Sequence, residues 1–185
     1  MEKRDATLLV IFTETPLQGA FIIDLEPQMD ERGFFARTFC RREFEARGLN
    51  PEVAQCNMSY NATAGTLRGM HFQNSPVSEA KLVRCVRGGI HDVIVDLRPR
   101  SATYRHYHSM ELTAENRRAL FVSKHFAHGF QTLTNDTEVE YQMSEFHDPA
   151  AGAGFRYDDP AFAIGWPLKV SIISQQDLGW PAFPI

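Results

Sequence analysis

Short apolar runs, each closed by turn-forming residues, recur along most of the chain. The runs cover 20–27, 81–86, 90–97, 104–112, 119–124, 129–135 and 137–145. Many short strands at this spacing, separated by Asn, Asp, Gly and Pro, are typical of an antiparallel β-sandwich or barrel. The turn Arg87-Gly88-Gly89 lies between two of the runs and predicts that they form a hairpin, because glycine takes up positive φ without a steric penalty.

Helical patterns are few. Residues 41–47 (RREFEAR) predict one or two helical turns that end near Gly48, and residues 158–167 predict a proline-bounded loop with a single turn. Neither an internal repeat nor a linker interrupts the chain, so residues 1–185 are expected to form a single domain. The segment 168–185, which ends in GWPAFPI, is expected to pack over the surface as a C-terminal tail.

Composition narrows the class of protein. With 185 residues, 43% hydrophobic and 23% charged, the chain is long enough for one globular core and is not biased toward disorder. Its net charge of -4 argues against a general affinity for nucleic acid or acidic membranes. The three cysteines have no CxxC spacing, and no run approaches the roughly 18 apolar residues of a membrane span. We therefore expect a cytoplasmic protein without nucleic-acid or membrane partners.

Two strands carry residues with chemical potential. In TEVEYQMSE (137–145), alternation puts Tyr141 on the apolar face, so this tyrosine is either a core residue bonded locally or a proton donor in a dry cavity. In GTLRGMHFQ (65–73), alternation puts Arg68 and His71 on opposite faces, with a glycine beside His71 that leaves room for a ligand. His71 is either a satisfied histidine or a base, and Lys81 is either a snorkelling strand-end lysine or a functional one.

A metal site is a weaker alternative. His106 and His108 share a strand face as an HxH pair, and His128 follows one strand later, an arrangement similar to cupin metal sites. However, Arg100 stands where the first cupin metal box has glycine, and SKHFAH lacks the proline and glycine of the second box. No G-x-S-x-G, P-loop or G-x-G-x-x-G is present, so nucleophile-elbow and dinucleotide functions have no support.

Six ordered segments carry a family resemblance. They are ERGFFARTF (31–39), QCNMSYNATAGTLRGMHFQ (55–73), KLVRCVRGGIHDVIVDLR (81–98), ELTAENRRALFVSKHFAHGF (111–130), VEYQMSEFHDP (139–149) and FRYDDPAFAIGWP (155–167). Together they resemble the dTDP-4-dehydrorhamnose 3,5-epimerase family over roughly residues 18–180. The resemblance implies an all-β, cupin-type jelly roll (a double-stranded β-helix) with few short helices, no metal and no cofactor. It also implies a homodimer that exchanges N-terminal strands.

The implied activity is that of an isomerase acting on a nucleotide-diphosphate 4-keto-6-deoxy sugar. The C4 ketone acidifies the hydrogens at C3 and C5, so a base can remove one to give an enolate and an acid can return a proton to the opposite face. The family pattern makes His71 the base, Asp177 the carboxylate that orients it, Lys81 the support of the enolate oxygen and Tyr141 the acid. The implied substrate-binding residues are Arg32, Gln55, Asn57, Arg68, His128, Phe130 and His147.

Three departures from the family pattern leave the details open. Arg37 stands where an acidic residue is usual, His147 where a second tyrosine is common, and Lys124-His125 where an acidic or small residue precedes glycine. The base, its carboxylate and the acid are all present, so proton transfer is expected. The alternatives are inversion at C3 or C5 alone, a different nucleotide or a heptose substrate, a catalytically silent sugar-nucleotide binder, and the metal cupin.

Overall fold

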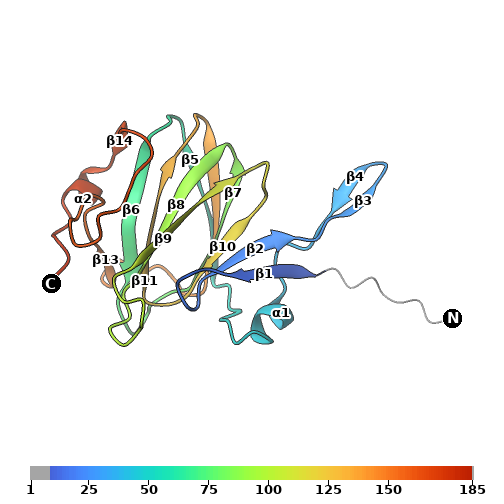
Figure 1. Cartoon of the computed structure of the whole chain (residues 1–185), viewed down its shortest axis with the longest axis horizontal. Helices are drawn as coiled ribbons and strands as arrows, with labels where there is room; N and C mark the ends of the chain where they lie inside the picture. Colours follow the sequence, from blue (N-terminus) through green and yellow to red (C-terminus); the bar gives the residue numbers. More distant parts are fainter. Residues whose placement is uncertain (1–8, 185) are drawn as a thin grey trace.

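The computed structural model describes residues 9–184, which form two facing, mainly antiparallel sheets (Figure 1). The first sheet has the order β1 (Val10–Glu14), β2 (Phe21–Leu25), β10 (Ala119–Val122), β7 (Lys81–Arg87), β12 (Thr137–Met143) and β5 (Gln55–Asn61). The second has the order β13 (Gly152–Gly154), β6 (Thr66–Gln73), β11 (Phe126–Thr132), β8 (Gly89–Asp96) and β9 (Tyr107–Thr113), and β14 (Ile172–Ile173) pairs with β6 in parallel. The predicted all-β jelly roll is confirmed.

The main core lies between the two sheets. Inward-facing apolar side chains such as Val83 and Val139 of the first sheet pack with Ile94 and Phe130 of the second, and all four are at most 2% exposed. Alternation along each strand supplies one such face per strand, and its burial is the main driving force for closing the two sheets on each other. A second cluster forms where the helix α1 (Arg41–Glu45) covers the outer face of the first sheet with Phe44.

The turn at Arg87-Gly88-Gly89 does not close a hairpin. Strand β7 lies between β10 and β12 in the first sheet, whereas β8 lies between β11 and β9 in the second, so the turn crosses from one sheet to the other. The predicted hairpin was therefore wrong, although Gly88 does have a positive φ of 74°. Glycines mark where a chain reverses, but they do not determine which strands then become neighbours.

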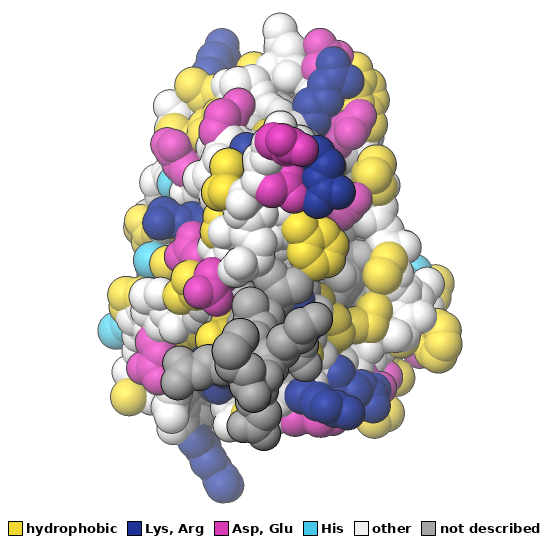
Figure 2. All heavy atoms as spheres, turned by 90° about the vertical axis from the view of Figure 1, so that its right-hand side faces the viewer, with side chains coloured by type: hydrophobic (Ala, Val, Ile, Leu, Met, Phe, Trp, Pro, Cys, Tyr) yellow, Lys and Arg dark blue, Asp and Glu magenta, His cyan; other side chains and the backbone are white. Residues whose placement is uncertain are grey.

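A two-stranded hairpin projects from the body of the fold. It consists of β3 (Gln28–Asp30) and β4 (Gly33–Phe35), and Figure 1 shows it extending away from both sheets. Its apolar side chains are solvent-exposed in the single chain: Met29 by 73%, Phe34 by 44% and Phe35 by 67%. Figure 2 views the molecule from the side of this hairpin and shows hydrophobic side chains exposed among acidic and basic ones.

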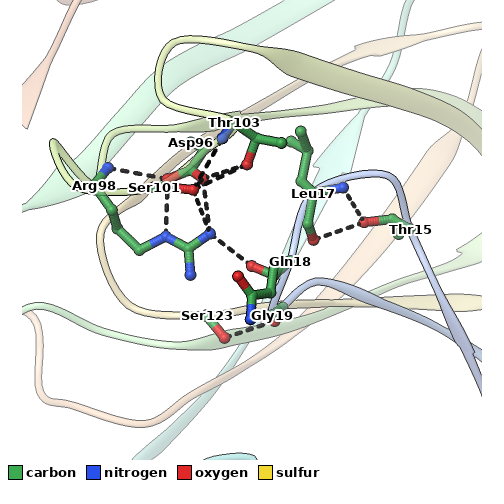
Figure 3. A network of polar contacts seen from close by, with 9 residues as sticks. All are labelled: Thr15, Leu17, Gln18, Gly19, Asp96, Arg98, Ser101, Thr103 and Ser123. Atoms are coloured by element: carbon green, nitrogen blue, oxygen red, sulfur yellow. Dashed lines mark hydrogen bonds and ion pairs between the residues drawn. The ribbon is translucent and has the colours of Figure 1, made fainter.

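A buried carboxylate network stabilises the end of β8 (Figure 3). Asp96, 0% exposed, accepts two hydrogen bonds from the Arg98 side chain, at 2.8 and 2.7 Å, and one each from the hydroxyls of Ser101 and Thr103, at 2.6 and 2.7 Å. Arg98 also donates to the carbonyl of Gln18 at 2.6 Å. The network therefore connects the loop after β8 to the turn between β1 and β2.

The C-terminal segment folds back over the second sheet. After β14, the short helix α2 (Gln175–Leu178) begins at Ser174, whose hydroxyl accepts the backbone N–H of Asp177 at 3.0 Å. Within the described part of the chain, no helix is long and apolar enough to cross a membrane.

Candidate active site

Two adjoining cavities open between the sheets and the C-terminal segment. The first, of about 600 Å³, is called here the Tyr141 cavity, and its walls include Arg68, His71, Lys81, Tyr141 and Asp177. The second, of about 580 Å³, is called the His147 cavity. The two share a boundary formed by Asn57, His71, Lys81, Met143 and Gln176. A long ligand could therefore occupy both and pass His71 and Lys81 on its way.

His71 and Asp177 form a hydrogen-bonded pair at this boundary. The His71 Nε2 lies 2.6 Å from the Asp177 Oδ1, and the other carboxylate oxygen of Asp177 accepts the backbone N–H of Gly69 at 3.4 Å. Burial alone would raise the pKa of the Asp177 carboxyl, but the interaction with His71, together with the hydrogen bonds from Gly69 and Ser174, outweighs burial and holds that pKa below its usual value. Asp177 is thus an anion that fixes the imidazole, whose side chain is 43% exposed to the cavities.

An irregularity in β6 places Arg68 and His71 at the same cavity. In the pairing of β6 with β11, His71 lies opposite His128 but Arg68 lies opposite Phe130, so β6 has one more residue than β11 between these two pairs. One extra residue reverses the face on which the following side chains point. The expectation that Arg68 and His71 face opposite ways was therefore wrong, because it assumed an unbroken strand.

Glycines permit this irregularity. Gly69 has a φ of 132°, and a Cβ there would lie 2.5 Å from the Cα of Gly129 on β11. A Cβ on Gly129 would in turn lie 2.6 Å from the Met70 sulfur. The space beside His71 is thus filled by the neighbouring backbone, not by room for a ligand as the sequence suggested.

Lys81 is buried at the start of β7. Its side chain is 9% exposed, and its Nζ lies 3.0 Å from the Glu79 Oε1 and 3.4 Å from the backbone carbonyl oxygen of His71. Both cavities include Lys81 in their walls. The ammonium group is therefore a fixed positive charge at the boundary and does not snorkel to bulk solvent.

Tyr141 projects from β12 into the cavity that bears its name. Its hydroxyl lies 3.1 Å from the Ser59 Oγ, and its ring packs near His128 and Phe130, with ring centroids 6.4 Å from each. Burial raises the pKa of the Tyr141 phenol well above its ordinary value. The phenol therefore keeps its proton near neutral pH and can act as a donor.

The base and the acid candidates stand on opposite walls. His71 comes from β6 of the second sheet, whereas Tyr141 and Lys81 come from β12 and β7 of the first sheet. A ligand lying in the Tyr141 cavity therefore has an imidazole on one side and a phenol on the other. This is the arrangement that inversion of a carbon centre by proton removal and return requires.

The other predicted binding residues divide between the two cavities. His128 and Phe130 line the Tyr141 cavity, Gln55 and His147 line the His147 cavity, and Asn57 lines both. The Gln55 side-chain carbonyl accepts the backbone N–H of His147 at 2.5 Å, which holds the loop after β12 against β5. Arg68 is oriented by its Nε, which donates to the Asn61 Oδ1 at 2.7 Å.

Arg32 is the predicted site residue that the single chain does not bring to the cavities. It lies at the turn of the β3–β4 hairpin, its side chain is 86% exposed, and its hydrogen-bond partner is Asp30. The metal alternative also finds no support. Among residues 9–184, no three His, Cys, Asp or Glu side chains gather closely enough to hold an ion, and His128 pairs instead with Asp92 at 2.7 Å.

Residues that contact the predicted catalytic side chains were missed in the sequence, among them Glu79, Ser59 and Trp180. Glu79 pairs with Lys81, Ser59 contacts Tyr141, and the Trp180 ring lies edge-on to His71 with centroids 6.3 Å apart. Ser59 had a detectable signal, because Gln55, Asn57, Ser59 and Asn61 alternate as an inward polar face of β5 while Met58 and Tyr60 are exposed. Glu79 and Trp180 lie outside any strand pattern and carried no such signal.

Known proteins are similar to this chain in sequence and in fold. The family model described as dTDP-4-dehydrorhamnose 3,5-epimerase matches residues 14–184. A protein of that name from Methanothermobacter thermautotrophicus is 42% identical over 91% of this chain and 92% of its own length. The crystal structure of one from Elizabethkingia anophelis has a TM-score of 0.91 at 35% identity, covering 94% of this chain and 96% of that one. Another, from Bacillus anthracis with TDP and PPi bound, has a TM-score of 0.90 at 37% identity and covers 95% and 100%.

Proposed function

The chain belongs to the dTDP-4-dehydrorhamnose 3,5-epimerase family, and we propose on that premise how its own residues carry out the epimerisation of a dTDP-linked 4-keto-6-deoxy sugar. The observation that carries the proposal is the placement of the His71–Asp177 pair and the Tyr141 phenol on opposite walls of one cavity. The reaction belongs to deoxysugar biosynthesis, and each proton transfer is assigned to a side chain of this protein.

The first half of the reaction is proton removal. With Nε2–H donated to the Asp177 carboxylate, the imidazole of His71 has its other nitrogen free to accept a proton from C3 or C5 of the sugar. The electrons of the broken C–H bond move to the C4 oxygen and give an enolate. The Lys81 ammonium lies at the same boundary and stabilises the negative charge on that oxygen.

The second half returns a proton from the other side. The Tyr141 phenol donates to the same carbon while the enolate electrons return from oxygen to carbon, which inverts the centre. The His128 and Phe130 rings pack beside the Tyr141 ring and hold the phenol in place in the cavity. Repetition at the second carbon requires that the phenolate regain a proton and that His71 lose one.

The diphosphate is expected to lie near Arg68. Arg68 is the arginine that lines the Tyr141 cavity, and its planar guanidinium cation is suited to bind phosphate oxygens. Gln55, Asn57 and His147 then contact the remainder of the nucleotide in the adjoining cavity. His147 stands where a tyrosine is common in the family, and it is a candidate for selecting the nucleobase of the substrate.

We propose further that the enzyme is a homodimer in which Arg32 reaches the site of the partner. The hairpin that carries Arg32 projects from the body of the fold (Figure 1), and its apolar side chains are exposed. Met58 and Tyr60 of β5 are also exposed, by 60% and 52%. Apolar surface of this kind is commonly covered by a second subunit. Strand β1 pairs with β2 of its own chain in this structure, and exchange of N-terminal strands stays a prediction, as does the cytoplasmic location.

NMR in D2O tests the proposed reaction directly. Purified protein is incubated with dTDP-linked and other nucleotide-linked 4-keto-6-deoxy sugars, and exchange at C3 and C5 is followed separately. Exchange at both positions with new stereoisomers supports the proposal, and exchange at one position identifies a single-carbon epimerase. Binding of dTDP without exchange on any sugar would identify a silent binder and refute the proposed activity.

The His71→Ala variant tests the role of the base. Loss of general-base catalysis is expected to lower turnover by about 10²- to 10⁴-fold, while dTDP binding is retained because the phosphate contacts lie elsewhere. His106→Ala is the matched control, since His106 is exposed and lies outside both cavities. Unchanged turnover in His71→Ala would remove His71 from this role.

A further inference from the structure

Among the ion pairs that Lys and Arg form in the described chain, Glu79–Lys81 is the one in which both side chains are almost fully buried. Glu79 is 3% exposed and Lys81 is 9% exposed, with 3.0 Å between the Glu79 Oε1 and the Lys81 Nζ. Glu79 lies in the connection between β6 and β7 and lines the His147 cavity. Its second oxygen, Oε2, is buried and has no hydrogen-bond partner among the described residues.

Such a pair is not explained by stability. Removing two charges from water is expensive, and their attraction offsets that expense only when the remaining donors and acceptors are satisfied. Here one carboxylate oxygen is left unsatisfied. A buried pair of this kind is more readily understood as an arrangement that fixes the orientation of one of its members.

The contacts of Lys81 define that orientation. An ammonium group has three N–H donors in tetrahedral geometry. The ammonium forms an ion pair with the Glu79 carboxylate and donates a hydrogen bond to the backbone carbonyl of His71, 3.4 Å away, so the third N–H has no partner among the residues described. Because Lys81 lines both cavities, this third donor is available to a ligand at their boundary. The contact to His71 also fixes the ammonium relative to the strand that carries the base.

We infer that Glu79 is a positioning residue that aims the free N–H of Lys81 at the C4 oxygen of the sugar. Glu79 itself does not contact the reacting atoms. This inference rests on the proposed role of Lys81 in stabilising the enolate. With Glu79 present, two anchors hold the ammonium and leave one direction for its third donor. Without Glu79, the flexible four-carbon side chain of Lys81 retains only the weak contact to the His71 carbonyl, and its third N–H no longer has a fixed direction.

Steady-state kinetics of two variants test this inference with a dTDP-linked 4-keto-6-deoxy sugar. Glu79→Leu removes the acceptor, and kcat is expected to fall by roughly 100-fold while KM changes by less than about threefold, because the loss affects the transition state rather than nucleotide binding. Glu79→Gln keeps an acceptor oxygen at the same distance from the backbone and is expected to restore kcat to within about tenfold of wild type. A KM-against-kcat split with rescue by Gln is not expected of a residue that merely supports the fold.

The matched control is Asp96→Asn. Asp96 is also a buried carboxylate paired with a cation, but it lies outside both cavities. The kcat of Asp96→Asn at 25 °C is expected to equal that of wild type. This control separates the general effect of losing a buried carboxylate from the specific effect of losing Glu79. Thermal melting and dTDP binding of each variant report whether it is folded.

A double-mutant cycle keeps the inference testable if Glu79→Leu alone does not fold. Lys81→Met combined with Glu79→Leu replaces the ion pair by two apolar side chains, which is often tolerated. If Glu79 acts through Lys81, the double variant has the same kcat as Lys81→Met within about twofold. A further loss of tenfold or more would show that Glu79 acts elsewhere and would overturn the inference.

Two other outcomes also overturn the inference while leaving the proposed function intact. One is wild-type kcat in a folded Glu79→Leu variant. The other is a Glu79→Gln variant as impaired as Glu79→Leu, which would show that the charge of Glu79, not the aim of Lys81, is needed. Inactive wild-type protein on every sugar would instead refute the proposed function, and this control is read before any variant.

Discussion

Acid sensitivity of the fold is predicted to depend strongly on one carboxylate, Asp96. Burial alone would raise the pKa of Asp96, but the hydrogen bonds from Arg98, Ser101 and Thr103 more than offset burial and lower that pKa from 3.8 to about 2. Because the pKa is lower in the folded than in the unfolded chain, the contribution to stability is fully present above about pH 4. It is lost as the pH falls through the interval from about 4 to about 2.

The magnitude follows from the same two values. A pKa change from 3.8 to about 2 corresponds to about 2 kcal/mol of free energy of unfolding. About half of this contribution is already lost at pH 3. For a chain of this length, 2 kcal/mol corresponds to a shift of roughly 4 to 8 °C in Tm.

The perturbation is Asp96→Asn, and the assay is urea unfolding followed by circular dichroism at pH 7, 5 and 3. The variant is expected to be less stable than wild type by about 2 kcal/mol at pH 7 and 5, and by about half as much at pH 3. Asp158→Asn is the matched control, because Asp158 accepts an equivalent pair of hydrogen bonds from Arg156 but is 42% exposed, where solvent screens the interaction. A difference between wild type and Asp96→Asn that does not change with pH would refute the reasoning.

Two further predictions concern the site and the assembly. Tyr141→Phe removes the proton donor but leaves His71 intact, so solvent deuterium exchange should persist while net inversion falls by at least about 100-fold. NMR in D2O measures the exchange and the inversion. Wild-type values for exchange and inversion would mean that another acid acts. Arg32→Ala and His71→Ala should each be inactive alone. A dimer with one subunit of each variant has one site with both native residues, so a mixture should regain part of the wild-type activity. A mixture as inactive as either variant would place Arg32 outside the partner's site.

Much of the fold could be predicted because it follows from alternation along single strands. The inward position of Tyr141, the burial of its neighbour Val139 and the helical turns before Gly48 all depend on local periodicity, and the structure has each of them. The partners of β7 and β8 could not be predicted in this way. Strand neighbours are set by contacts between residues far apart in sequence, and a glycine turn is compatible with either a hairpin or a crossing between sheets.

In the candidate site, too, some features follow from local periodicity and others depend on contacts between residues far apart in sequence. His71, Lys81 and Tyr141 could be selected from their positions on strands, but the pairing of His71 with Asp177 joins residues 106 positions apart and came only from the family resemblance. Glu79 was missed because it lies in a connection where no periodicity constrains its side chain. Its importance becomes visible only when the burial of Lys81 is known.

The irregularity in β6 explains why the placement of Arg68 and His71 in GTLRGMHFQ could not be predicted from periodicity. A regular strand would separate Arg68 and His71 on opposite faces, and a ligand would then need both faces of one sheet. One additional residue, permitted by the contact of Gly69 with Gly129, brings a phosphate-binding cation and a base to the same cavity. The spacing of three residues between Arg68 and His71 is therefore necessary for this arrangement. With an even spacing, the same irregularity would have placed the two side chains on opposite faces of the strand.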